Sequence, residues 1–233
     1  LPVDQIQVRH LGHDKFLVLE GNRRTAALKT IEQDNLDSGK FDRNILKELP
    51  VVIYEGADTE IDHLIVMGLK HISGNKKCGE WNQAKLKKKL SDSETLSEDD
   101  ICSAVGIDKT SLRRDMRALA LIEQYKESDY GDQFSEAMYS VFRELITYTS
   151  IKNWIGWNED SYKAENSNEV DRLFALLSRD SKYEDSDSDQ KQVIEPAITK
   201  REEARTLSKI VDDEKALRIL EETRDITAAF NMS

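Results

Sequence analysis

Cysteine and histidine are scarce in this chain. Cys78 and Cys102 are its only thiols, they lie far apart in the sequence, and no histidine stands at metal-ligand spacing from either of them. This pattern excludes a disulfide framework and a zinc site of known spacing. We therefore expect no metal site and two small buried thiols.

Long apolar runs are also absent. No stretch approaches the roughly 18 residues that a membrane-spanning helix needs, and the first residues lack the basic and apolar regions of a secretory signal. We expect a cytoplasmic protein with no membrane partner. Of the 233 residues, 38% are hydrophobic and 34% are charged, which suffices for one large domain or two to three small ones.

The net charge of −11 argues against a protein that coats nucleic acid through bulk charge. The charge is unevenly distributed, because residues 70–89 contain seven lysines and a single acid, Glu80. Acidic, serine-rich stretches follow at 91–100 and near 180–191, and the second is predicted to be a solvated linker. Charge runs of this kind are usually solvated faces, so the lysines alone indicate little.

Alternating apolar and polar residues predict two strands, "LPVDQIQV" (1–8) and "KFLVLEG" (15–21), which form a hairpin around "RHLGHD". Apolar spacing then predicts a helix over 25–35, and the β-branched run "LPVVIYEG" (49–56) predicts a third strand. A further helix is expected over 58–72. From Glu80 onward, strand patterns disappear and helical patterns dominate.

The stretch "LEGNRRTAALK" (19–29) places a glycine, an amide and two arginines between a strand and a helix. A glycine there lets the backbone approach a ligand, the helix start offers unpaired N–H groups, and guanidinium groups bind phosphate oxygens in pairs. The alternative is an ordinary turn with solvated arginines. In the first interpretation, the phosphate-binding residues are Gly21, Asn22, Arg23, Arg24 and Thr25.

The stretch "EDDICSAVGIDKTSLRRDMRALALI" (98–122) has helix-turn-helix spacing, with Gly106 at the turn and Asp108 capping the second helix. A recognition helix needs short polar side chains at its start and cations along its exposed face. The alternative is a plain helical hairpin with solvated arginines. Asp115 is an anion near the expected inward row, which neither interpretation explains. The predicted DNA-binding residues are Lys109, Thr110, Ser111, Arg113, Arg114 and Arg117.

The first motif, with the strand "LPVVIYE" after it, resembles the N-terminal domain of the ParB family, in the ParB/sulfiredoxin-like fold, whose signature is G-E-R-R-x-R-A. Gly21, Arg23, Arg24 and either Ala26 or Ala27 match its phosphate-binding loop. The resemblance covers residues 1–90 and implies that the family's first strand and helix precede Leu1. It also implies that the loop binds a nucleoside triphosphate, CTP in that family, with Mg²⁺.

Several positions depart from the family pattern. Asn22 replaces an acid, Ala26 replaces the last arginine, and Lys70 and His71 stand where the family has an acid and an amide. Metal positioning and water activation lose oxygen ligands by these changes. We therefore expect phosphate binding with little or no turnover and assign no catalytic residue; His71 remains a candidate contact to a nucleotide.

The predicted fold class is an α+β ParB/sulfiredoxin-like domain (1–90), then a helix-turn-helix (91–127), then a helical C-terminal domain (128–233) for dimerisation or partner binding. This order is also that of the ParB family. The predicted function is a nucleoid-associated, homodimeric DNA-binding protein of a partition, plasmid-control or mobile-element or defence system, with a nucleotide as a switch. The alternative is a weak nucleoside triphosphatase or a nuclease, in which Asp14, Glu20 and Glu55 would hold a metal.

Overall fold

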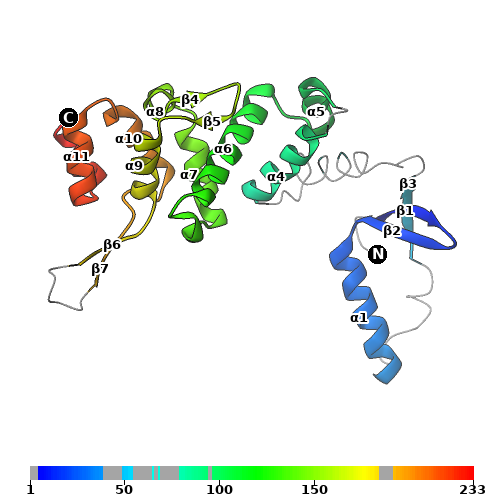
Figure 1. Ribbon diagram of the computed structural model, residues 1–233. Helices are drawn as coiled ribbons and strands as arrows, with labels where there is room; N and C mark the ends of the chain where they lie inside the picture. Colours follow the sequence, from blue (N-terminus) through cyan, green and yellow to red (C-terminus); the bar gives the residue numbers. More distant parts are fainter. Residues whose placement is uncertain are drawn as a thin grey trace. The chain divides into compact units, whose positions relative to one another are not determined.

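The computed structural model describes residues 5–38, 49–54, 65, 68, 79–93, 96–183 and 191–233. It is an α+β structure, mostly helical, with a three-stranded mixed sheet in the first part of the chain (Figure 1). Lys70, His71, Glu55 and Cys78 lie outside the described residues. None of the described helices is long and apolar enough to cross a membrane.

The chain forms two compact units. The N-terminal unit contains residues 1–77 and 89–106, and the C-terminal unit contains residues 78–88 and 107–233. The predicted domain boundaries at 90 and 127 do not coincide with this division. The segment predicted as a helix-turn-helix contributes its first helix to the N-terminal unit and its second helix to the C-terminal unit.

The predicted hairpin of the N-terminal unit is present. Strand β1 (Ile6–Gly12) pairs antiparallel with β2 (Lys15–Glu20), and only His13 and Asp14 connect them. Both connecting residues have positive φ, 51° and 58°, which suits the twist of a two-residue hairpin turn. The turn is therefore shorter than "RHLGHD", because residues 9–12 continue β1.

Strand β3 (Val51–Tyr54) pairs parallel with β1, so the strand order is β2-β1-β3. A parallel neighbour needs a crossover connection, and helix α1 (Asn22–Ser38) lies within it (Figure 1). This helix begins three residues earlier than the predicted one. Ile6 and Val8 of β1 and Leu19 of β2 are buried and form the apolar centre of the sheet.

Helix α5 (Glu98–Val105) closes the N-terminal unit and carries clear start and stop signals. The hydroxyl of Ser97 accepts from the Asp100 backbone N–H, and the Asp100 carboxylate accepts from the Ser97 N–H, a reciprocal capping box. Gly106 ends the helix in the left-handed conformation with φ of 66°. Ile101, Cys102 and Val105 are buried, so the Cys102 thiol lies in the interior as predicted.

The C-terminal unit is built around helix α6. Its Tyr125 is fully buried, and its ring meets Phe142 and Phe174 edge-on at centroid distances of 5.3 and 5.2 Å. These contacts join α6 to α7 and α9 in one core. The helical elements of this unit are α4 (Glu80–Ser91, to residue 88), α6 (Lys109–Glu127), the 3₁₀ turns Gly131–Gln133 and Glu136–Met138, α7 (Tyr139–Leu145), α8 (Thr149–Trp154), α9 (Ser167–Leu177), α10 (Arg201–Ile210), α11 (Glu214–Thr223) and α12 (Ile226–Asn231).

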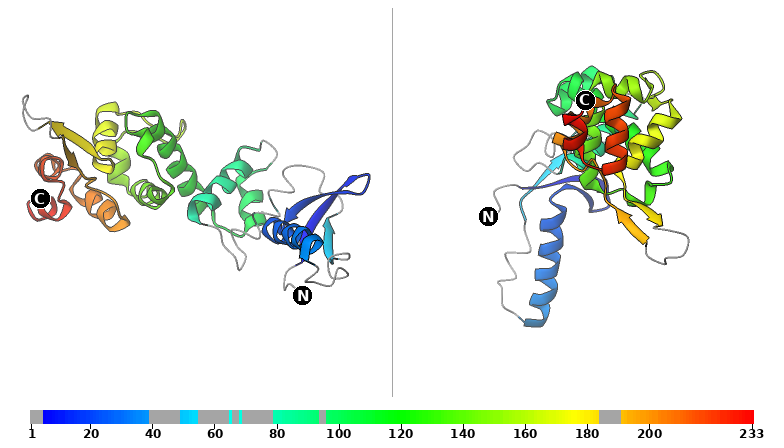
Figure 2. Two further views of the ribbon diagram at one scale, coloured as in Figure 1. Left: turned by 90° about the horizontal axis from the view of Figure 1, so that it is seen from below. Right: turned by 90° about the vertical axis from the view of Figure 1, so that its left-hand side faces the viewer.

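This unit also contains strands that the helical pattern did not predict. Strand β4 (Trp157–Asn158) pairs with β5 (Lys163–Ala164). Strand β6 (Asp180–Tyr183) pairs antiparallel with β7 (Lys191–Ile194), and this second pair projects beyond the helices of the unit (Figure 2). The stretch expected to be a linker therefore has paired strands at its ends. Directly before β6, the Gln133 side chain donates to the Arg179 carbonyl and accepts from the Arg179 N–H.

Candidate functional site

The first predicted site lies where β2 ends and α1 begins. Gly21 has φ of 101°, and a Cβ atom there would lie 3.1 Å from Ile6 Cγ1 and 3.4 Å from a terminal nitrogen of Arg24. Both the backbone and the packing on β1 therefore favour glycine. Its carbonyl accepts from the Thr25 N–H at 2.8 Å and from the Thr25 hydroxyl at 3.1 Å, so α1 starts directly after it.

The side chains of this turn differ in exposure. Asn22 and Arg23 are exposed, whereas Arg24 is half-buried and its guanidinium folds back toward Gly21. Gly21 has no side chain that could cap the first N–H groups of α1. The exposed cation Arg23 lies next to these groups, at the positive end of the helix dipole. The structure thus brings together all five predicted residues of the loop, and His71 lies outside the described residues.

Two of the acids that the enzymatic alternative invokes, Asp14 and Glu20, lie in the part of the chain that the structure describes. Asp14 forms part of the hairpin turn, and Glu20 ends β2 directly before Gly21. Among the residues that the structure describes, no group of three His, Cys, Asp or Glu side chains could hold a metal ion. We assign no metal ligand.

The second predicted site is the start of α6. The Asp108 carboxylate accepts from the Ser111 N–H at 2.8 Å and caps the helix as predicted. Lys109, Thr110 and Arg113 are exposed, whereas Leu112 is buried. The outer edge of the first turns therefore presents two cations and a hydroxyl, and we call Lys109, Thr110 and Arg113 the outer edge of α6.

Ser111, Arg114 and Arg117, which were also predicted to contact DNA, are less exposed and bind residues of the C-terminal unit. The Arg143 guanidinium lies 3.5 Å from the Ser111 hydroxyl, and Arg117 forms an ion pair with Glu159 at 2.7 Å. Arg114 donates to the Arg143 carbonyl at 3.1 Å and to a Glu144 carboxylate oxygen at 2.9 Å. The exposed cationic face of α6 is therefore narrower than its sequence indicates.

Asp115 lies in the interior, where it accepts from three side chains. Its carboxylate is 2.5 Å from Lys87 Nζ, 2.5 Å from Arg143 Nε and 2.9 Å from the Tyr139 hydroxyl. Burial acts to raise the pKa of Asp115, but Lys87 and Arg143 outweigh it and hold the pKa below its usual range. This arrangement explains the anion on the inward row, and an inward aspartate is itself a signal that cations of other helices must face it.

Glu144 of α7 is the second buried acid beside α6. It is 8% exposed and accepts from Arg114, from the Tyr148 hydroxyl at 2.7 Å and from Arg205 at 3.3 Å. Burial acts to raise the pKa of Glu144, whereas hydrogen bonds from Tyr148 and Arg205 and the charge of Arg114 lower it, and the net shift is downward. The sequence pattern did not indicate these residues.

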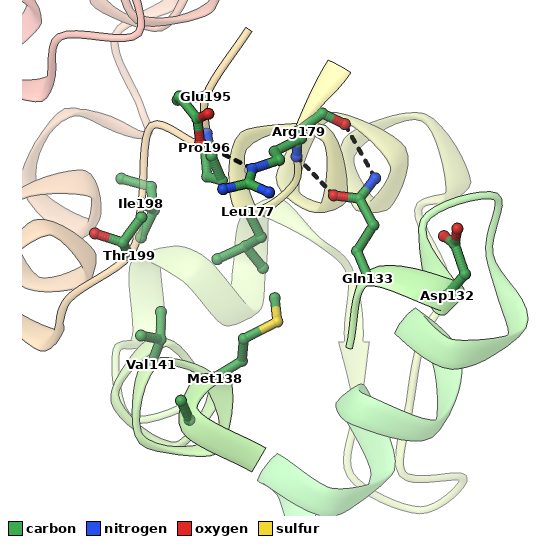
Figure 3. A pocket seen from close by; sticks show the side chains of 11 residues that line it. Asp132, Gln133, Met138, Val141, Leu177, Arg179, Glu195, Pro196, Ile198 and Thr199 are labelled. Atoms are coloured by element: carbon green, nitrogen blue, oxygen red, sulfur yellow. Dashed lines mark hydrogen bonds and ion pairs between the residues drawn. The ribbon is translucent and has the colours of Figure 1, made fainter. Parts of the chain in front are cut away.

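An open groove of about 640 Å³ lies on another part of the C-terminal unit (Figure 3). Arg179 and Glu195 form an ion pair at 2.9 Å in its wall, and Met138 and Leu177 point into it. Its described lining contains no histidine, cysteine or serine, and its one hydroxyl, that of Thr199, donates to the Glu203 carboxylate at 3.1 Å. The lining residues are Asp132, Gln133, Ala137, Met138, Val141, Leu177, Arg179, Glu195, Pro196, Ile198 and Thr199.

Comparison with models of protein families found no match, and no curated protein matches the chain.

Proposed function

We propose that this protein binds duplex DNA through the outer edge of α6, and that the start of α1 binds a nucleotide phosphate as a switch, as in ParB-like proteins. The single observation that carries the proposal is the exposure of Lys109, Thr110 and Arg113 on a helix whose opposite face is buried and ion-paired. Cations and short polar side chains at the start of a helix are what a major groove accepts.

The local helix signals support this assignment. Helix α5 has eight residues and ends at a left-handed glycine, and α6 begins two residues later at an aspartate cap. A short helix, a glycine turn and a capped second helix are typical of a helix-turn-helix motif. In that motif the second helix enters the major groove with its N-terminal residues, which here are those of the outer edge of α6.

The distribution of charge is compatible with DNA binding at this place. Residues 128–233 contain 23 acidic and 14 basic side chains, which is −9 of the total charge of −11. Residues 1–127 are therefore nearly neutral, with 20 basic and 22 acidic side chains. Because exposed charges act over about 10 Å at 0.1 M salt, DNA at α6 would respond mainly to the charges within that distance and less to the total charge of the chain.

The start of α1 supports the nucleotide part of the proposal. The exposed Arg23 stands next to the first N–H groups of a 17-residue helix, which is a favourable place for an anion. The resemblance to the ParB loop adds CTP as the first nucleotide to test. A homodimer in a partition, plasmid-control or mobile-element or defence system belongs to the same proposal.

Selection from a random pool of 30-base-pair duplexes tests the DNA part. The full chain is immobilised, bound DNA is recovered and sequenced, and fluorescence anisotropy then compares a selected duplex with a scrambled one at fixed salt. We expect the selected duplex to bind at least roughly 1,000-fold more tightly, as specific DNA-binding proteins do. Equal binding of both duplexes, or no binding, would contradict the proposal.

A further inference from the structure

Two neighbouring residues of α6 pair with two neighbouring residues of α7 in a crossed pattern. On α6 the cation Arg114 precedes the acid Asp115, and on α7 the cation Arg143 precedes the acid Glu144. Arg114 pairs with Glu144 at 2.9 Å, and Arg143 pairs with Asp115 at 2.5 Å. We call these four residues the crossed ion pairs.

The crossed ion pairs are shielded from solvent to an unusual degree for charged groups. The Asp115 and Glu144 side chains are 2% and 11% exposed, and those of Arg114 and Arg143 are 27% and 22% exposed. Arg114 also donates to the backbone carbonyl of Arg143, which ties it to α7 at a second point. Ion pairs with this burial are screened far less by salt than surface pairs are.

This pattern restricts the rotation of α6. Successive residues of a helix point about 100° apart, so Arg114 and Asp115 hold α6 at two different angles around its axis. If α6 turned by one residue or slid along α7, a buried carboxylate would lose its partners, which is strongly unfavourable. Lys87 of α4 and Tyr139 of α7 bind the same Asp115 carboxylate and reinforce the restriction.

From this geometry we infer that the crossed ion pairs are the positioning element of the DNA-binding surface: they set the rotation of α6 so that Lys109 and Arg113 face outward. Arg114 then acts through Glu144 and does not touch DNA. This inference rests on the proposed function. It assigns to the crossed ion pairs an effect on DNA binding although they lie outside the interface with DNA.

Neutralising the acids distinguishes positioning from simple electrostatics. Glu144→Gln and Asp115→Asn each remove a negative charge close to the outer edge of α6. By electrostatics alone this raises the affinity for DNA, and it also releases an arginine that could bind phosphate. If the acids position α6, the affinity for the selected duplex falls instead, by roughly tenfold, while the affinity for a scrambled duplex changes less.

The matched control is Glu159→Gln, which removes the same charge from an ion pair with Arg117, also on α6, outside the crossed ion pairs. We expect this variant to bind the selected duplex as tightly as the unaltered chain or slightly more tightly. Circular dichroism and a urea titration of each variant establish that the protein is folded at the assay temperature. If Asp115→Asn does not fold, Glu144→Gln decides the question, because Asp115 and its three donors remain intact in it.

The outcomes separate the two proposals. If the unaltered chain binds no selected duplex, the proposed function fails. If it binds, and folded Glu144→Gln and Asp115→Asn bind equally well or better, the positioning inference is overturned while the proposed function stands. A fall in specific affinity for the two variants, with Glu159→Gln unchanged, supports the inference.

Discussion

Asp115 is the most confined charge of the C-terminal unit. Its residue is 1% exposed, and its carboxylate accepts from Lys87, Tyr139 and Arg143, which come from two other helices. Removing a carboxylate from water is unfavourable unless donors replace the water, and here three donors do so. The same contacts that neutralise Asp115 also hold α4 and α7 against α6.

The donors that surround Asp115 predict an acid-labile contribution to stability. The pKa of Asp115 is lower in the folded protein than in the unfolded chain, so its stabilising effect is fully present above about pH 4 and is lost as the pH falls through the folded pKa. The pKa of Glu144 is also lowered in the folded protein, so its stabilising effect is likewise lost as the pH falls. Urea unfolding at pH 7, 5, 4 and 3 should show a smaller acid-dependent loss for Asp115→Asn than for the unaltered chain. Equal losses in the two proteins would contradict this account.

Gly21 is the residue with the tightest steric requirement at the start of α1. Gly21→Ala adds a Cβ 3.1 Å from Ile6 Cγ1 and places alanine at φ of 101°, so we expect a loss of about 1–3 kcal/mol. Gly12→Ala is the matched control, since Gly12 has φ of 88° and no atom within 4 Å of a Cβ. Thermal unfolding followed by circular dichroism should give a lower melting temperature for Gly21→Ala than for Gly12→Ala. The reverse order would mean that the contact with Ile6 is unimportant.

Helix α1 begins directly after Gly21, which has no side chain, and this has a consequence for ligand binding. If Asn22, Arg23 and the first N–H groups bind phosphate, CTP or ATP should bind with an affinity that falls as salt is raised. Arg23→Ala should weaken binding at least roughly tenfold, as expected for loss of a charge-assisted pair. Lys29→Ala, an exposed cation further along α1, is the control.

Calorimetry measures this binding, and a phosphate-release assay on the same samples measures turnover. We expect binding with little or no phosphate release, because Asn22 stands where the loop of ParB proteins, which this stretch resembles, has an acid. Absence of binding by either nucleotide would reduce the loop to a structural turn. Rapid release that Glu20→Gln abolishes would instead favour the enzymatic alternative.

Elements with local signals could be predicted from the sequence. Alternation indicated β1 and β2, and the residues Gly106 and Asp108 marked the end of α5 and the start of α6. The strands β6 and β7 could not be predicted, because "DSKY" and "KQVI" do not alternate apolar and polar residues and are joined by backbone pairing. Contacts of this kind leave no periodic pattern in the chain.

The candidate site followed the same rule. Spacing along α6 predicted that its cations lie on an exposed face, and Lys109 and Arg113 are exposed. The partner of Arg114 could not be read from spacing, since Glu144 lies 30 residues away on α7. An inward acid such as Asp115 was the one sequence signal that cations of other helices would face α6.

The molecule as a whole combines a nearly neutral first half with an acidic second half. Because −9 of its −11 charge lies in residues 128–233, unspecific attraction to DNA should be weak, and binding should depend on a few cations. The outer edge of α6 supplies two of them. The affinity for DNA should therefore depend on the number of phosphate contacts and not on the total charge of the chain.

The most direct test is the salt dependence of binding to the selected duplex for Lys109→Ala/Arg113→Ala and for its control Lys215→Ala/Arg218→Ala, which removes two exposed cations from α11. Anisotropy titrations between about 50 and 200 mM salt give the slope of log affinity against log salt. We predict that the α6 variant loses at least roughly tenfold in affinity and that its slope becomes shallower by about one to two, while the α11 variant matches the unaltered chain. Equal behaviour of the two variants, with both folded, would contradict DNA binding through α6.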